Sequence, residues 1–279
     1  MIKALRRLFV TEAPPAEPLP ADGKVTLADV LRRGWFEQWY QPKIELRTRR
    51  LVGAEGLARA RQPDGRVLPP GVFLPGAPEA DMLALTERAI STALSDWEEL
   101  AANGIPVKLA VNVPVSALVK LPIADIVRTG RPKAESWPGL ILEVTEDEVI
   151  RDLKLAHDAA ERLQEAHCSL ALDDFGAGYS SLARLRQLPF SELKIDRAYV
   201  MNCHIDRVNA GLCEVFVELA KRFGLKTVAE GIETTHESHK LQALGADVGQ
   251  GYLFAKPMPK RELIALVRKR ASSRIGGLV

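Results

Sequence analysis

The stretch that decides the fold is WYQPKIELRTRRLVGAEGL, residues 39–57. It holds two strand-like runs, residues 39–46 and 51–57, separated only by residues 47–50. Two parallel strands need a crossover of a dozen or more residues, so a connection this short predicts an antiparallel hairpin. A sheet built on this hairpin therefore contains one strand that runs against its neighbours.

Beyond the hairpin, short apolar runs alternate with helical patterns. Residues 204–224 show the helical spacing clearly, because Val208, Leu212, Val215, Leu219 and Phe223 recur every three or four residues and Gly224 gives a stop. The further expected strands are residues 107–113, 140–146, 169–174, 192–196, 226–231 and 247–254. Eight strands in a chain of this length predict an α/β fold, a modified TIM (β/α)8 barrel with one antiparallel strand.

The composition is typical of a globular protein. The 279 residues are 47% hydrophobic and 27% charged, and the formal net charge of +2 gives no broad positive field for nucleic acid, so neither DNA nor RNA is expected as a partner. Three cysteines without CxxC spacing favour a reducing, cytoplasmic location. We expect no transmembrane span, because no apolar run reaches roughly 18 residues.

The chain divides into one large unit and two tails. Residues 11–24 hold four prolines and few large apolar residues, so residues 1–24 are predicted to be a disordered or linker-like tail. Residues 25–271 contain no second linker and no repeat, which indicates a single barrel domain. Residues 272–279 are expected to be a loose C-terminal tail.

Polar side chains recur at the expected carboxyl ends of the strands, where barrels of this kind carry their active sites. They are Glu55, Asn112, Glu143, Asp173, Asp174, Lys194 and Glu230. For any one acid, a solvated charge or a helix cap is the simplest interpretation. Recurrence at five strand ends favours a common site, and Asp173 and Asp174 together require a positive partner.

Carboxylate and amide oxygens without histidine or cysteine suit Mg²⁺ or Mn²⁺ better than Zn²⁺. The adjacent aspartates can serve two metals about 4 Å apart, an arrangement typical of phosphate-ester hydrolysis. Lys194 fits beside the attacking water or the phosphate, and Arg59 offers a planar fork for phosphate oxygens. These residues favour a metal-dependent phosphoesterase without naming its substrate.

Eight motifs in order resemble those of the EAL-domain cyclic di-GMP phosphodiesterases, here as a stand-alone EAL domain. Over about residues 25–270 these are YQP, EGLAR, VNV, LEVTE, LDDFGAGYSSL, LKID, VAEGIE and QGYLF. The resemblance implies a modified barrel, often a homodimer. It also implies hydrolysis of cyclic di-GMP to linear pGpG with two Mg²⁺ or Mn²⁺ ions per site.

By this resemblance, one metal is held by Glu55, Asn112, Glu143 and Asp173, and the second by Asp173, Asp174 and Glu230. Catalysis is assigned to Glu55, Asp174, Lys194 and Glu230, with Lys194 positioning the nucleophilic water. The expected substrate-binding residues are Gln41, Leu57, Arg59, Asp196 and Gln250. Glu146 is expected to anchor the DFGAGYSS loop, and Glu233 is expected to support the ligand residues from behind.

Two departures from the family pattern leave every ligand in place. Gly56 stands where the signature has alanine, and we expect it to loosen the backbone beside Glu55. Pro114 falls within VNVPVSAL and should shape the next helix start. The alternative to an enzyme is a catalytically silent cyclic di-GMP receptor or interaction scaffold, and a regulatory protein partner is a further expectation.

Overall fold

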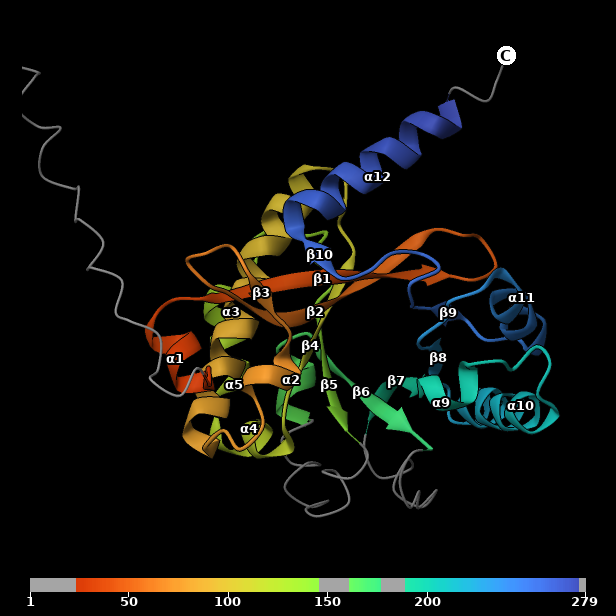
Figure 1. Cartoon of the computed structure of the whole chain (residues 1–279), viewed down its shortest axis with the longest axis horizontal. Coiled ribbons are helices and arrows are strands. Elements are labelled where there is room, and N and C mark those ends of the chain that lie inside the picture. The colour runs from red at the N-terminus through yellow and green to blue at the C-terminus, as the bar shows by residue number, and fades with distance from the viewer. Residues whose placement is uncertain (1–23, 146–160, 177–188, 276–279) are drawn as a thin grey trace, which may run out of the picture.

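The computed structural model describes residues 24–145, 161–176 and 189–275 (Figure 1). Its ten strands are β1 (Phe36–Glu45), β2 (Leu51–Arg61), β3 (Val67–Leu68), β4 (Lys108–Asn112), β5 (Leu140–Thr145), β6 (Cys168–Phe175), β7 (Phe190–Ile195), β8 (Lys226–Ala229), β9 (Val248–Gly249) and β10 (Met258–Pro259). The described helices are α1 (Leu27–Arg32), α2 (Pro70–Phe73), α3 (Glu79–Ala102), α4 (Val115–Lys120), α5 (Ile123–Gly130), α9 (Arg197–Val200), α10 (Arg207–Arg222), α11 (Thr235–Leu244) and α12 (Lys260–Ile275).

All strands belong to one sheet, in the order β10–β1–β9–β8–β7–β6–β5–β4–β2–β3. An additional pairing of β1 with β2 closes β1, β2 and β4–β9 into an eight-stranded barrel. Around the barrel, β2 and β4–β9 pair in parallel with their neighbours, whereas β1 is antiparallel to β2 and β9. The predicted modified TIM barrel with one antiparallel strand is therefore confirmed.

The strands sort their side chains between the barrel interior and the surrounding helices, because residues two apart share a face. Ala110, Ile141 and Ala171 form a small apolar cluster. Two residues further along, the same three strands carry Asn112, Glu143 and Asp173. A polar layer at the carboxyl ends therefore follows directly on a layer of compact apolar side chains.

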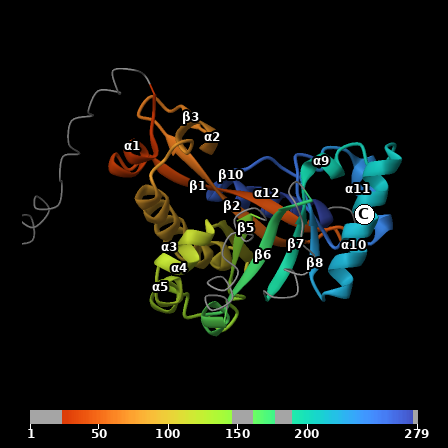
Figure 2. The same ribbon diagram turned by 90° about the horizontal axis from the view of Figure 1, so that it is seen from below.

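Helices cover the outside of the barrel, with α3–α5 and α10–α11 on opposite sides of the strands in Figure 2. The long helix α3 packs on the outer face of the hairpin, where the Tyr40 hydroxyl donates to Asp96 at 2.7 Å. Trp97 is also buried and donates to the Val107 carbonyl at 2.9 Å. These contacts tie the reversed strand β1 and the start of β4 to one helix.

The predicted helix near residues 204–224 is confirmed as α10, which begins at an Asp206 cap and is followed by Gly224 with φ of 69°. Its buried face consists of Cys213, Val217 and Ala220. Val208 and Val215, members of the apolar repeat, are instead 69% and 60% exposed. One helix face therefore carries apolar side chains that the barrel does not cover.

The two predicted tails fall largely outside the described residues. The description begins at residue 24, and α12 runs to Ile275, past the boundary expected at residue 271. Among the described helices, none combines the length and apolar character that crossing a membrane requires.

Candidate active site

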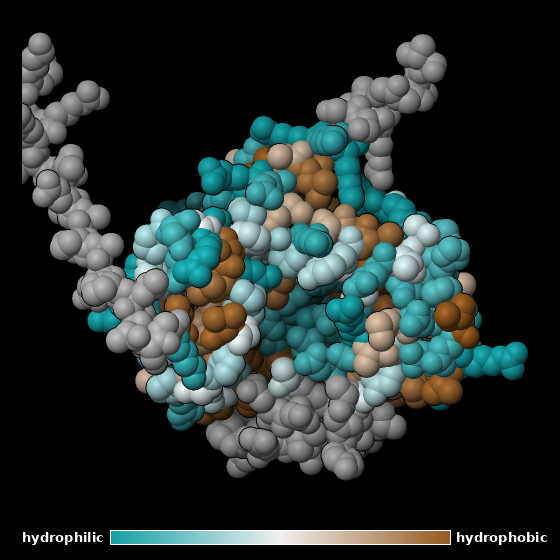
Figure 3. All heavy atoms as spheres, in the orientation of Figure 1, coloured by the Kyte–Doolittle hydropathy of each residue, from teal (hydrophilic) through white to brown (hydrophobic). Residues whose placement is uncertain are grey.

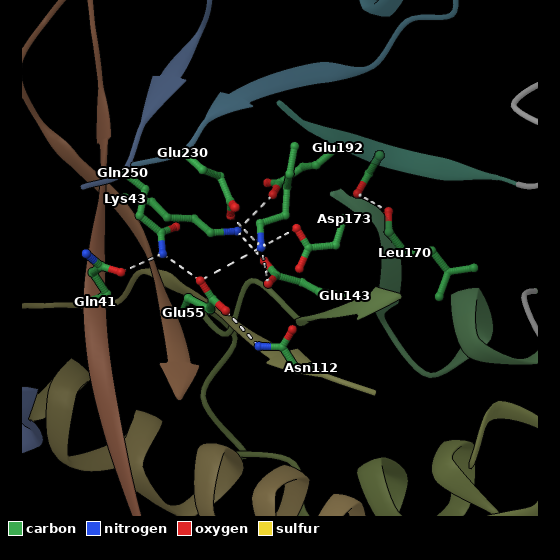
Figure 4. Close-up of polar contacts among 12 residues, drawn as sticks. Gln41, Lys43, Glu55, Asn112, Glu143, Leu170, Asp173, Glu192, Glu230 and Gln250 are labelled. Atoms are coloured by element: carbon green, nitrogen blue, oxygen red, sulfur yellow. Dashed lines mark hydrogen bonds and ion pairs between the residues drawn. The ribbon is translucent and has the colours of Figure 1, made fainter. Parts of the chain in front are cut away.

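Four acids at the mouth of the barrel surround the ammonium group of Lys194 (Figure 4). Lys194 comes from β7 and is 1% exposed. Its Nζ lies 2.7 Å from Glu143 Oε2, 2.7 Å from Glu230 Oε1, 2.9 Å from Asp173 Oδ1 and 3.8 Å from Glu55 Oε2. A cation thus holds together carboxylates that would otherwise repel one another across the closed barrel.

Two amides contact the Glu55 carboxylate, and a third amide holds one of them. Asn112 donates to Glu55 Oε1 at 2.7 Å, and Gln250 donates to Glu55 Oε2 at 2.5 Å and to Gln41 Oε1 at 3.0 Å. Gln41 in turn donates to the Ala255 carbonyl at 3.1 Å and lies directly across the hairpin from Glu55. Gln250 Oε1 is buried and has no partner among the described residues, so it is an acceptor available to a bound group.

Asp173 and Asp174 both reach the mouth because the backbone turns at the end of β6. Asp174 has φ of 54°, in the left-handed region that aspartate tolerates, and its N–H donates to Asp173 Oδ1 at 2.9 Å. One oxygen each of Asp173, Asp174 and Glu230 lies within 4.8 Å of the others. These three carboxylates, from the ends of two strands, could share one cation.

The pKa values reflect a site short of positive charge. Burial raises the pKa of Glu230 to about 8, and the charges of Asp173 and Glu55 add to the rise despite Lys194. Burial also raises the pKa of Glu55. Glu143 is the exception: burial opposes its ionisation, but the two lysines that contact it lower its pKa to about 2. Glu143, which has two ammonium partners, is thus stabilised in its charged form.

The second lysine on Glu143 is Lys43, from β1. Its Nζ lies 2.7 Å from Glu143 Oε1 and 3.1 Å from Glu192 Oε2. Sequence reasoning missed this lysine and Glu192, although strand alternation places both on the faces that carry Gln41 and Lys194. Lys43 stands two residues after Gln41 and Glu192 two residues before Lys194, so each shares the inward face of its strand.

Three of the five expected substrate residues, Gln41, Leu57 and Gln250, line a pair of adjoining cavities. One of about 250 Å³ is lined by Gln41, Glu55, Leu57, Gln250 and other mouth residues. The second, of about 390 Å³ and largely apolar, adjoins it at Glu55 and Leu57 and extends toward α2 and α3. A long ligand that crosses the acids therefore has space on both sides of Glu55.

The remaining predicted residues lie at the margin of the mouth or beyond the described chain. Arg59 is half-buried, with its guanidinium 5.8 Å from the centre of the Trp39 ring. Asp196 caps α9 through the Ala198 N–H, and Glu233 forms an exposed ion pair with Arg197 at 2.7 Å. Glu146 lies outside the described residues.

Gly56 has a packing reason in addition to its backbone freedom. A Cβ built on Gly56 would lie 2.2 Å from Gln38 Nε2, well inside contact distance. The Gln38 side chain, 7% exposed, therefore fills the space of the alanine methyl in the family signature. Its amide has no hydrogen-bond partner among the described residues.

The fold is a closed TIM-like barrel, and the acidic cluster and amide at the carboxyl ends of its strands are the ligand types that hard divalent cations prefer. The family model described as EAL domain matches residues 24–257. The chain belongs to the EAL domain family.

Individual relatives agree with this assignment. The chain is 36% identical over 244 residues to cyclic di-GMP phosphodiesterase RocR of Pseudomonas aeruginosa, covering 86% of this chain and 62% of RocR, so it spans less than two thirds of that relative. A structure of the MucR phosphodiesterase in complex with c-di-GMP aligns with a TM-score of 0.77 and 33% identity, over 85% of this chain and 97% of that one. The calcium/cy-diGMP complex of BlrP1 from Klebsiella pneumoniae aligns with a TM-score of 0.69 and 26% identity, over 80% of this chain and 56% of that one.

Proposed function

We propose that this chain hydrolyses cyclic di-GMP to linear pGpG by metal-assisted attack of water. The observation that carries the proposal is the mouth of the barrel, where four carboxylates lie within 3.8 Å of the buried Lys194 ammonium. The names of RocR as a cyclic di-GMP phosphodiesterase and of the MucR complex support the substrate. The two adjoining cavities offer space for an extended dinucleotide on either side of Glu55.

The residues at the mouth fit two hard divalent cations, for which we propose Mg²⁺ or Mn²⁺. Glu55, Asn112, Glu143 and Asp173 would hold one ion, and Asp173, Asp174 and Glu230 the other. These five carboxylates and Glu192 face two lysines, Lys194 and Lys43, so four negative charges remain in excess, which is the charge that two such ions neutralise. When bound, the ions lower the pKa of a water ligand and stabilise the attacking and leaving oxygens.

The protein's own groups would orient the phosphate and the water. Lys194 can release carboxylates to incoming cations and keep its proton beside the attacking water, since burial opposes its charge but the surrounding acids hold its pKa well above the usual range. Gln41 and Gln250 hold Glu55 in place and leave the Gln250 carbonyl free to accept from a ligand. Leu57, Arg59 and Asp196 would line the path of the substrate.

The proposal is tested by incubating purified protein with cyclic di-GMP and Mg²⁺ or Mn²⁺ and separating the products by chromatography. We expect pGpG from the wild-type protein, and its loss with chelator and in Glu55→Ala, because the variant lacks a carboxylate that two amides and Lys194 contact. Intact dinucleotide with both metals would contradict the enzyme and favour a receptor or scaffold with the same fold.

We also propose that the chain is a homodimer in the cytoplasm. The exposed apolar side chains Ile205, Val208 and Val215 on and before α10 support a protein interface, and brown spheres lie on this side of the molecule in Figure 3. Three free cysteines support a reducing location. A regulatory protein partner stays a prediction from the sequence.

The dimer has its own test. Val208→Glu/Val215→Glu should shift the protein to monomer in light scattering after size exclusion, because two charges would be buried at the interface without partners. Val72→Glu, a change at an exposed valine on α2, should leave the mass unchanged. An unchanged dimer in the α10 variant would show that the interface lies elsewhere.

A further inference from the structure

Lys43 is a buried cation that the proposed reaction does not use. It is 2% exposed and extends from the reversed strand β1 across the barrel interior to Glu143 on β5 and Glu192 on β7 (Figure 4). In the sheet order, neither of these strands is a neighbour of β1. The ammonium therefore links three separate parts of the barrel wall beneath the mouth.

The barrel makes space for this side chain at Gly53, which lies directly across the hairpin from Lys43. A Cβ on Gly53 would lie 3.5 Å from Lys43 Cδ, 3.6 Å from Lys43 Cβ and 3.1 Å from the Lys108 carbonyl oxygen. A side chain at position 53 would press on the Lys108 carbonyl and contact the stem of the lysine. Gly53 thus leaves room for the stem of Lys43, and ion pairs hold the end of its side chain.

Each of the two lysines contacts a different oxygen of the Glu143 carboxylate. Lys43 contacts Oε1 at 2.7 Å, and Lys194 contacts Oε2 at 2.7 Å. Lys194 lines the cavity at the mouth, whereas Lys43 is absent from the described lining of either cavity around Glu55. A cation that enters from the mouth therefore meets Oε2 and competes with Lys194, while the contact of Lys43 with Oε1 lies behind the carboxylate.

We propose that Lys43 is a positioning residue of the metal site: it holds Glu143 Oε1 so that Oε2 alone faces the mouth as a ligand, and Glu192 balances its charge. This inference rests on the metal site of the proposed function but not on its substrate. Groups that hold a ligand from behind commonly change metal affinity by 10- to 100-fold when removed. Charge balance alone is the competing explanation, since Lys43 also neutralises Glu192.

The test is calorimetric titration of chelator-treated protein with Mn²⁺, without dinucleotide, for wild type, Lys43→Met, Glu192→Gln and Lys43→Met/Glu192→Gln. The double variant removes one positive and one negative charge, so the net charge of the interior is that of the wild type. We expect the Mn²⁺ dissociation constant to rise about tenfold in Lys43→Met and in the double variant. Glu192→Gln should stay within about threefold of wild type, because the 2.7 Å contact between Lys43 and Glu143 remains.

Thermal unfolding midpoints of the metal-free variants show whether weaker Mn²⁺ binding comes from a misplaced Glu143 or from a less stable fold. Lys43→Met leaves Glu143 and Glu192 without this partner and should unfold at lower temperature, whereas the double variant should recover part of the loss. Recovery of Mn²⁺ affinity in the double variant, or tighter binding by Lys43→Met, would overturn the positioning role in favour of charge balance. Wild-type protein that bound no Mn²⁺ would overturn the metal site itself and this inference with it.

Discussion

Asp173→Asn should lower phosphodiesterase turnover by roughly a thousandfold, equivalent to about 4 kcal/mol of transition-state stabilisation. Asp173 is the one carboxylate that we assign to both metal ions, so its neutralisation weakens both. The asparagine keeps an oxygen that can accept from the Asp174 N–H, which Asp173 Oδ1 now does at 2.9 Å. The turn at the end of β6 should therefore survive the change.

The stability of the metal-free variant distinguishes a loss of turnover at the metal site from a loss caused by misfolding. Lys194 keeps Glu143 and Glu230 as partners at 2.7 Å after the substitution, and the mouth loses one of its repelling charges. We expect the free energy of unfolding of metal-free Asp173→Asn to lie within about 1 kcal/mol of wild type. Asp64→Asn, at an exposed turn, is the matched control for turnover and should be fully active. If Asp173→Asn kept turnover within tenfold of wild type, Asp173 would not be a ligand of both metal ions.

Metal-free wild-type protein should lose stability as the pH rises from about 5 to about 8. Burial raises the pKa of Glu230 to about 8, against a usual value of 4.5, so the folded state retains a proton that the unfolded chain has released. Stability then falls with pH, and Glu230 contributes at most roughly 1.4 kcal/mol per unit to this fall. The lowered pKa of Glu143, about 2, acts only below pH 4.5 and does not contribute to the slope.

Urea unfolding at several pH values, with chelator, measures this slope in wild type and in Glu230→Gln. The glutamine cannot ionise, so the variant should show a flatter profile and exceed wild type in stability near pH 8. Added Mn²⁺ should flatten the wild-type profile as well, because the cation replaces the retained proton. Glu218→Gln, which removes an exposed acid on α10, should retain the wild-type slope. Parallel profiles for Glu230→Gln and wild type would contradict the raised pKa.

The sequence predicted the barrel because its decisive features are local. The five-residue connection between β1 and β2 forced the antiparallel pair, and position at the carboxyl ends of expected strands brought Glu55, Asn112, Glu143 and Asp173 to one end. The geometry that the sequence left open depends on distant contacts. Lys43 meets Glu143 and Glu192 only because the barrel closes, and no local pattern places β1 across from β7.

The apolar repeat of α10 shows that a correct helix prediction does not say which of its apolar side chains are buried. Spacing correctly predicted a helix, but Val208 and Val215 lie on its exposed face while Cys213, Val217 and Ala220 face the barrel. Helical periodicity identifies an apolar stripe without saying whether the same chain covers it. The Gly56 position is similar, since its contact with Gln38 follows from the packing of β1 against β2 rather than from the signature itself.

The reversed strand also has a consequence for the order in which the molecule folds. The hairpin of β1 and β2 joins Gln41 to Glu55 through contacts close in sequence, so this pair can form early and without the rest of the barrel. The pairing of β1 with β9 joins Ile44 to Gly249, at the far end of the chain, and must come late. Gln250 follows that last pairing and donates to Glu55. We therefore expect the β1–β2 side of the mouth to form early in folding and the β9 side to form late. Glu55 gains its contact with Gln250 only when the barrel has closed.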